Sequence, residues 1–222
     1  MLERKVLETS RSAAVILKKS GVTPRSDRME NITYHKLLDS AQGMIQSNGF
    51  NAFSYRDLST LVGITTASIH YHFPTKADMG EALTRRYRES FNEVLRRIEA
   101  DNRDAPTRIE QYVKQFLQTL EHGGKICLCG MLASDYQTLP ENVRKEIRAF
   151  FTENEAWLEM VLQQGKTDGS FVFDSEAKDL AIAFFAMIEG AMLGARMFED
   201  KSRLQRTVDC WRSSVFSQGK KG

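Results

Sequence analysis

Apolar residues recur every three or four positions along most of the chain, in segments that glycine, proline and short polar turns separate. This spacing puts the apolar side chains on one face of a helix. No segment alternates apolar and polar residues for long enough to predict a strand. The pattern therefore predicts an all-α fold.

The first 28 residues are predicted to form an N-terminal extension, with a helix over Glu3–Lys19 followed by a polar linker. The next predicted helix has Thr33 as its N-cap, because threonine is favoured at that position. It ends at Asn48 and Gly49, since glycine readily adopts the left-handed backbone that terminates helices. This helix opens a small domain predicted for residues 29–80.

Two short helices are predicted next, with Ser54 and Thr65 as their N-caps. The turn Gly63-Ile64 separates them, and the second helix spans Thr66–His72. A long helix follows Thr75. A larger helical domain is predicted for residues 81–217, with helices over Arg108–Leu120, around Cys127, from Pro140 onward, and over Ser175–Phe198 and Ser202–Phe216, and with a loop at Lys166–Ser170.

The bulk composition is that of a soluble globular protein, with 41% hydrophobic and 27% charged residues. No apolar run approaches the ~20 residues of a membrane span, so we expect no membrane partner. Three cysteines are too few for a disulfide framework, which favours the reducing cytoplasm. The net charge of +2 is uneven, because residues 1–100 carry 15 Lys and Arg against 11 Asp and Glu. Nucleic-acid contact is therefore expected in the N-terminal half.

A helix followed by two short helices with a glycine turn is the compact unit that places a recognition helix in the major groove. The segment Gly49–Met79 resembles the DNA-binding signature of tetracycline-repressor (TetR) type repressors. Ile69, Tyr71, His72, Phe73 and Lys76 stand at the matching positions. The similarity covers about 50 residues, Thr33–Leu83, and implies a homodimeric repressor whose N-terminal helix-turn-helix binds a palindromic double-stranded DNA operator.

The expected DNA contacts divide into two kinds. The capped starts of the two short helices can hold backbone phosphates, while side chains at the start of the second helix meet base edges. The resemblance implies further phosphate contacts for Tyr71, His72 and Lys76. Thr66 stands where many relatives carry Lys and His70 where Tyr is common, so no relative supplies the operator sequence. The predicted DNA-binding residues are Thr33, Ser54, Thr65, Thr66, Ala67, Ser68, His70, Tyr71, His72 and Lys76.

The segment Ala181–Ala195 is apolar around most of its circumference. Its small residues Gly190, Ala191 and Gly194 permit close helix approach. With the final helix, which carries Trp211, it resembles the four-helix bundle between TetR-type subunits. The alternative is an internal core helix of a monomer.

A ligand pocket is predicted among the long fourth helix, the short helix around Cys127 and the helix after Pro140, with Asp135 and Glu189 as sources of polarity. Its predicted lining is Phe91, Phe116, Met131, Phe150, Trp157, Phe184 and Met187. The alternative is that these residues form ordinary core, since aromatic and methionine side chains at helical spacing usually do.

Cys127 is predicted to receive the signal as an electrophile- or oxidant-sensitive thiol. If Gly124 caps the short helix, Cys127 lies in its first turn, where the helix dipole and Lys125 favour the thiolate. The stretch CLCGMLASD resembles the N-ethylmaleimide-reductase repressor branch of the family, whose members respond to electrophiles through a cysteine before Leu; Asp135 replaces the more usual Glu. A small apolar inducer and a purely structural role for all three cysteines are the alternatives.

Enzyme chemistry finds little support. The chain lacks a phosphate-binding glycine loop, a G-x-S-x-G elbow and an HExxH motif, so no catalytic residue and no cofactor are predicted. His122, Cys127 and Cys129 do not match a zinc spacing and lack a fourth ligand, so no metal is predicted. A helical protein-interaction adaptor remains the alternative function, and salt-sensitive DNA binding distinguishes the two.

Overall fold

The structure is a computed structural model that describes residues 25–216 of the 222-residue chain, so most of the predicted extension, including the helix over Glu3–Lys19, lies outside the described residues. The described part is helical, with a single isolated β-bridge between Phe171 and Phe216, which confirms the all-α prediction. The elements are α2 (Arg25–Asn48), α3 (Tyr55–Val62), α4 (Thr66–His72), α5 (Lys76–Asp101), α6 (Ala105–Glu121), α7 (Leu128–Ser134), the short 3₁₀ helix η1 (Tyr136–Thr138), α8 (Glu141–Asp168), α9 (Ala177–Met197) and α10 (Ser202–Val215).

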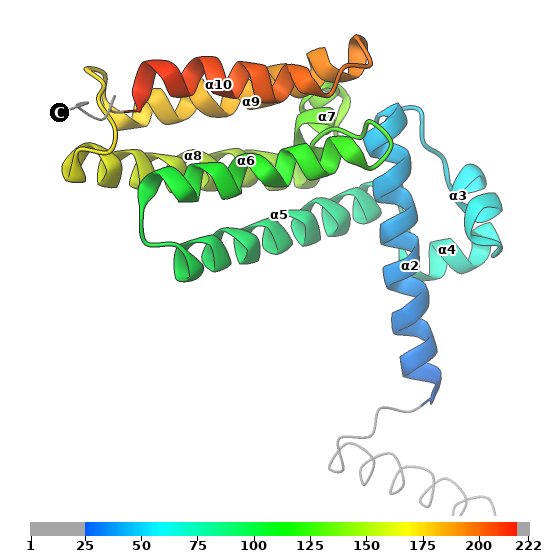
Figure 1. The fold of residues 1–222 in the computed structure, drawn as a ribbon. Coiled ribbons are helices and arrows are strands. Elements are labelled where there is room, and N and C mark those ends of the chain that lie inside the picture. Colours follow the sequence, from blue (N-terminus) through cyan, green and yellow to red (C-terminus); the bar gives the residue numbers. More distant parts are fainter. Residues whose placement is uncertain (1–24, 217–222) are drawn as a thin grey trace, which may run out of the picture.

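The helices form two groups, and Figure 1 shows α2, α3 and α4 standing at one end of the longer helices. Helices α5, α6, α8, α9 and α10 run side by side, and α7 lies close to α2. This arrangement places the short helix α4 and the face of α9 at separate parts of the molecule. The group of α2, α3 and α4 is the three-helix unit that the sequence predicts.

Two hydrophobic clusters hold these groups together. The larger one is built from α5, α6, α8, α9 and α10, and its centre holds aromatic residues such as Tyr112, Phe150 and Phe184. The smaller one lies under α2, α3 and α4, around Leu37 and Ile69, and it also takes apolar side chains from α7 and α8. Burying each such side chain stabilises the fold by about 1.5–3 kcal/mol.

Thr33 lies inside α2 and is not its N-cap, so that prediction is wrong. The helix begins at Arg25, and residues 25–28 of the predicted linker are helical. Nothing in that stretch breaks a helix, and Pro24 precedes it, a residue that is favoured at helix starts. A cap-type residue is therefore a weak signal when the residues before it also support a helix.

Helix α8 ends later than expected. It runs to Asp168 and stops at Gly169, whose φ of 79° lies in the left-handed region. The predicted loop at Lys166–Ser170 is therefore wrong for its first three residues. The glycine fixed the end, because a residue with a Cβ adopts this conformation only with strain.

Helix α9 is more apolar than the composition suggested. It has 21 residues and a mean hydropathy of 1.6 over an 18-residue window, so it is long and apolar enough to cross a membrane. In this structure 33% of that window is buried. The expectation that no segment approaches this length is wrong. One such helix is weak evidence for a span, because the core helix of a soluble protein also passes this test.

Candidate nucleic-acid interface and signal-receiving region

The two short helices begin at the predicted caps. The Ser54 hydroxyl accepts a hydrogen bond from the Asp57 amide at 3.3 Å, and the Thr65 hydroxyl accepts one from the Ser68 amide at 3.2 Å. Between them, Gly63 has a φ of 77° and ends α3 with a hydrogen bond to the Ser59 carbonyl. These local contacts fix the start and the direction of α4.

Burial of Ile69 decides which side of α4 faces out. Ile69 is fully buried, whereas Thr66 and Ala67 are exposed and Ser68 is half-buried. The structure therefore brings the three predicted base-contacting residues together at the exposed N-terminal end of α4. Whether they contact bases stays a prediction.

Tyr71 and His72 lie further along the same helix. The Tyr71 side chain is 71% exposed, and its hydroxyl donates to the Glu30 carboxylate of α2 at 3.4 Å. The His72 ring is half-buried and makes edge contacts with the rings of Tyr34 and Tyr71. Both polar groups are accessible enough to meet a phosphate, and neither is free of packing contacts.

His70 has a structural environment that the sequence did not reveal. Its Nδ1 lies 3.0 Å from the Pro74 carbonyl oxygen, and its ring meets the Tyr55 ring edge-on. The Tyr55 hydroxyl in turn donates to the carbonyls of Phe73 and Thr75. These contacts brace α3, α4 and the start of α5 against one another, so His70 positions α4.

Lys76 points toward aromatic rings. Its ammonium lies 4.5 Å from the centroid of the Phe50 ring and 5.1 Å from that of Phe53, a cation–π arrangement. Burial lowers the pKa of Lys76, and the nearby Asp135 carboxylate partly offsets this. The Lys76 side chain therefore packs on the aromatic residues after α2 while remaining partly exposed, and its phosphate contact stays a prediction.

The end of α2 is tied to the second group of helices. Arg196 of α9 donates to the carbonyls of Gln46 and Ser47. The buried Gln46 amide donates to the Ile126 carbonyl at 2.9 Å, and the Phe50 amide donates to the Asp135 carboxylate at 3.0 Å. The bonds from Arg196 and to Asp135 satisfy backbone groups at and just after the end of α2, which otherwise lack helical partners, and the Gln46 side chain ties this end to the segment before α7.

Helix α9 exposes an apolar face. Ile182, Leu193, Met197 and the following Phe198 are each more than 40% exposed. A Cβ built on the exposed Gly190 meets no atom within 4 Å. Of the other predicted interface residues, Ala191, Gly194 and Trp211 are half-buried, and the Trp211 ring packs against Phe184 with a centroid distance of 4.2 Å.

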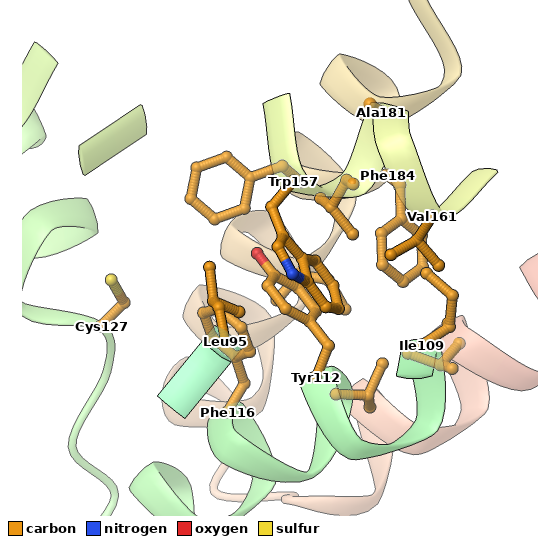
Figure 2. Packing of buried hydrophobic residues seen from close by; sticks show 14 of the residues in the cluster. Leu95, Ile109, Tyr112, Phe116, Cys127, Trp157, Val161, Ala181 and Phe184 are labelled. Carbon is orange, nitrogen blue, oxygen red and sulfur yellow. The ribbon is translucent and has the colours of Figure 1, made fainter. Parts of the chain in front are cut away.

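Most of the predicted pocket residues belong to the packed core. Figure 2 shows Trp157 and Tyr112 stacked at its centre, with ring centroids 5.4 Å apart and planes 16° apart. Phe116, Phe150 and Phe184 are buried around them, and Met131 and Met187 pack against this core. The core alternative fits these residues, because their rings fill the space between the helices.

The described residues instead form a cavity of about 630 Å³ between α2, α5 and α6. Helix α2 contributes Asp39, Gln42 and Gln46, and α5 contributes Arg86, Tyr87 and Phe91 among others. Helix α6 and the loop after it complete the wall with Gln115, Gln118, Thr119, His122 and Lys125. Phe91 is the one member of the predicted lining set that borders this cavity.

Cys127 has the opposite environment from the predicted one. Gly124 does not cap α7; the helix starts at Leu128 with Cys127 as the N-cap residue, and the Cys127 side chain is fully buried. Burial raises the pKa of the Cys127 thiol well above its usual value, and the neighbouring Glu189 and Cys129 raise it further. The expectation of a thiolate is wrong, because Cys127 lies in the core and not in an exposed first turn.

Glu189 of α9 is the charged neighbour of this thiol. Its carboxyl is buried, and burial raises its pKa to about 7, although a hydrogen bond from Cys127 acts in the opposite direction. One oxygen, Oε1, has no hydrogen-bond partner. The other lies so close to Gly130 that a Cβ on that glycine would collide with it. Within residues 25–216, no three His, Cys, Asp or Glu side chains gather as a metal site.

Two family profiles match the chain and together span most of it. "Bacterial regulatory proteins, tetR family" matches residues 37–83, and "Tetracyclin repressor-like, C-terminal domain" matches residues 105–211. The first covers the second half of α2, all of α3 and α4, and the start of α5. The second runs from α6 into α10 and includes Cys127, Cys129 and the face of α9.

Individual proteins agree with these profiles. A TetR-family transcriptional regulator from Agrobacterium tumefaciens is 31% identical, with a TM-score of 0.82 over 85% of this chain and 100% of its own. The reduced form of Escherichia coli NemR is 20% identical, with a TM-score of 0.73 over 84% of this chain and 99% of its own, and so shares the fold alone. The nucleoid occlusion factor SlmA of Aliivibrio fischeri is 26% identical over 76% of this chain and 84% of its own.

Proposed function

Since this chain belongs to the TetR family of bacterial regulatory proteins, we propose that it is a repressor that holds a palindromic operator as a homodimer until a chemical signal releases it. It is a regulator and not an enzyme, as are its relatives. The observation that carries the proposal is the exposed N-terminal end of α4, held in place by the Thr65 cap and the buried Ile69. We place the protein in the cytoplasm, in contact with DNA and not with a membrane.

Helix α4 enters the major groove in this proposal. Thr66, Ala67 and Ser68 then face base edges, while the helix starts capped by Ser54 and Thr65 contact the phosphates of the flanking backbone. Tyr71 and His72 add phosphate contacts from the same helix. His70 and Lys76 act chiefly by holding α4 and the start of α5 in place.

Charge supports a contribution from the N-terminal extension. Residues 29–80 carry three Lys and Arg against four Asp and Glu, whereas residues 1–28 carry seven against three. Neutralising phosphates requires cations, and the helix-turn-helix unit alone supplies few. We therefore assign part of the non-specific DNA affinity to the extension.

The experiment begins with selection of genomic DNA fragments by the purified full-length protein. Affinity for a selected operator and for a scrambled site is then measured across a salt series. Tyr71→Phe and His72→Ala are expected to weaken both alike, by about three- to tenfold each, because phosphate contacts carry no sequence information. Ser68→Ala is expected to change base preference. Thr60→Ala, an exposed substitution on α3, is the control.

The adaptor alternative makes a different prediction. An adaptor without DNA binding yields no enriched fragment and no affinity that falls with rising salt. Either result for the wild-type protein refutes the repressor proposal. Loss of operator binding in the Thr60→Ala control alone refutes the docking geometry, because it moves the contact surface from α4 to α3.

A further inference from the structure

The cavity of about 630 Å³ lies between α2 of the DNA-binding unit and two helices of the larger group. This volume falls within the range of small-molecule sites in proteins. Its wall combines one apolar side, with Tyr87 and Phe91 of α5, and a polar remainder of amide, hydroxyl and cationic groups. Such a lining fits a ligand with a ring at one end and a charge at the other.

An ion pair in the wall of the cavity joins α2 to α5. The Arg86 guanidinium lies 2.9 Å from the Asp39 carboxylate and within 3.4 Å of the Gln42 side-chain oxygen. The two partners differ in exposure: the Arg86 side chain is 24% exposed and that of Asp39 is 73% exposed. Asp39 is therefore the member that returns to water at little cost if another carboxylate takes its place.

A second cation, Lys125, also lines the cavity. The Lys125 ammonium lies 3.5 Å from the position that a Cβ on Gly43 of α2 would occupy. No carboxylate pairs with Lys125 among the described residues. With Arg86, it gives the cavity two cations against the single acid Asp39. The cavity therefore favours an anion.

We propose that this cavity binds a small aromatic carboxylate, whose carboxylate group displaces Asp39 from Arg86 while its ring lies against Tyr87 and Phe91. The Arg86 guanidinium already pairs with a carboxylate, and the aromatic side of the cavity favours an anion that carries a ring over inorganic phosphate. Ring hydroxyls of the ligand can bond to amides such as Gln115 and to the Thr119 hydroxyl. The exchange forms no covalent bond.

Binding would alter the link between the two groups of helices. Asp39 belongs to α2 and Arg86 to α5, so the exchange removes a direct ion pair between the DNA-binding unit and the long helix. Gln46, in the same wall, also holds the loop before α7 through the Ile126 carbonyl. Loss of operator affinity on ligand binding follows from this geometry, and this step rests on the proposed function. Binding of the ligand to the cavity does not depend on the proposed function.

The first measurement is calorimetric titration of the full-length protein with benzoate, 4-hydroxybenzoate and 4-hydroxycinnamate. At least one is expected to bind saturably with a Kd below about 1 mM, as suits ligands of this size. The neutral 4-hydroxybenzamide is expected to bind at least about tenfold more weakly than 4-hydroxybenzoate, because it lacks the negative charge. Inorganic phosphate is expected to bind at least about tenfold more weakly than 4-hydroxybenzoate as well, because it lacks the ring. No saturable binding of any carboxylate, or equal binding of the amide or of phosphate, overturns the proposal.

Three variants test the exchange. Arg86→Gln is expected to weaken carboxylate binding about tenfold or more, and Asp39→Asn to tighten it several-fold because the competing acid is gone. Arg96→Gln, on the same helix but exposed and paired with Glu93, is the matched control and leaves the affinity unchanged. Tighter binding by Asp39→Asn cannot result from misfolding, and unchanged or weaker binding by a variant with the wild-type unfolding midpoint refutes the displacement step.

Operator affinity is measured last, with and without saturating ligand. Release of the operator by the carboxylate, and weaker release from Arg86→Gln, supports the coupling. Ligand binding without operator release refutes the coupling and leaves the site intact. A wild-type protein that binds no DNA even without ligand refutes the proposed function alone, since the calorimetric result is independent of DNA.

Discussion

Replacing Glu189 with glutamine isolates one buried acid. The Glu189 carboxyl lies in the core beside Cys127 and Gly130, with one oxygen lacking a hydrogen-bond partner. Glutamine keeps the shape of the side chain and cannot ionise. The difference in stability between wild type and Glu189→Gln, followed against pH, therefore reports the ionisation of this group.

The structure gives the sign and size of the effect. Burial raises the Glu189 pKa from its ordinary value of 4.5 to about 7 in the folded protein. Below pH 4.5 the carboxyl is neutral in the folded protein and in the unfolded chain, so its ionisation costs the folded protein no stability. As the pH rises toward 7 the unfolded chain ionises first, so the free energy of unfolding falls. At 1.36 kcal/mol per pKa unit, the loss above pH 7 is about 3 kcal/mol.

The assay is urea unfolding of both proteins at one fixed concentration between pH 4.5 and 8, because the stability of a dimer depends on concentration. The wild-type midpoint is expected to fall relative to that of Glu189→Gln by about 1 M urea across this range. Groups remote from Glu189 titrate alike in the two proteins and cancel, and the buried Cys127 thiol, whose pKa lies well above its usual value, stays protonated in the folded protein over this range. Parallel midpoints at every pH, or a wild type that gains on the variant as the pH rises, refute the burial argument.

Three further substitutions test separate parts of the structure. Gly165→Ala is expected to lower the free energy of unfolding by about 1–3 kcal/mol, because the new Cβ collides with the buried Phe171 ring; Gly43→Ala, which has room, is the control. Gly190→Arg is expected to give a folded monomer in sedimentation, because the large charged side chain prevents close packing of α9 against a second subunit. Ala100→Arg, at an exposed position of α5, is the control and is expected to stay dimeric. A wild-type protein that is monomeric at micromolar concentration contradicts the α9 interface. A thiol reagent is expected to modify only the exposed Cys210 rapidly in the native protein, and operator release by a quinone that persists in Cys127→Ser removes Cys127 as the signal receptor.

Local signals in the sequence predicted the DNA-binding unit well. Ser54 and Thr65 cap α3 and α4 as expected, and Gly63 makes the turn, because each feature depends on neighbours within a few residues. The prediction that Thr33 caps α2 was wrong because it used Thr33 alone and not the residues before it. A cap-type residue does not start a helix when eight helix-compatible residues precede it.

Features that depend on distant segments could not be predicted. Burial among side chains from several helices raises the pKa of Cys127 most, and Glu189, which lies on α9 sixty-two positions away, raises it further. The cavity needs side chains from α2, α5 and α6, and periodicity within one helix does not show how three helices meet. The aromatic residues chosen for the pocket carry the same pattern whether they line a void or fill it, and here they fill it.

The smaller hydrophobic cluster crosses the boundary between the two groups of helices. Leu128 and Leu132 of α7 and Val143 and Ile147 of α8 are as much a part of it as Leu37 of α2. A fragment ending near residue 80 would expose that apolar surface and lose the partners of its own core. Exchanging DNA-binding units between relatives to change operator choice therefore requires carrying α7 and the first two turns of α8 with the graft, or redesigning the surface against which the unit rests.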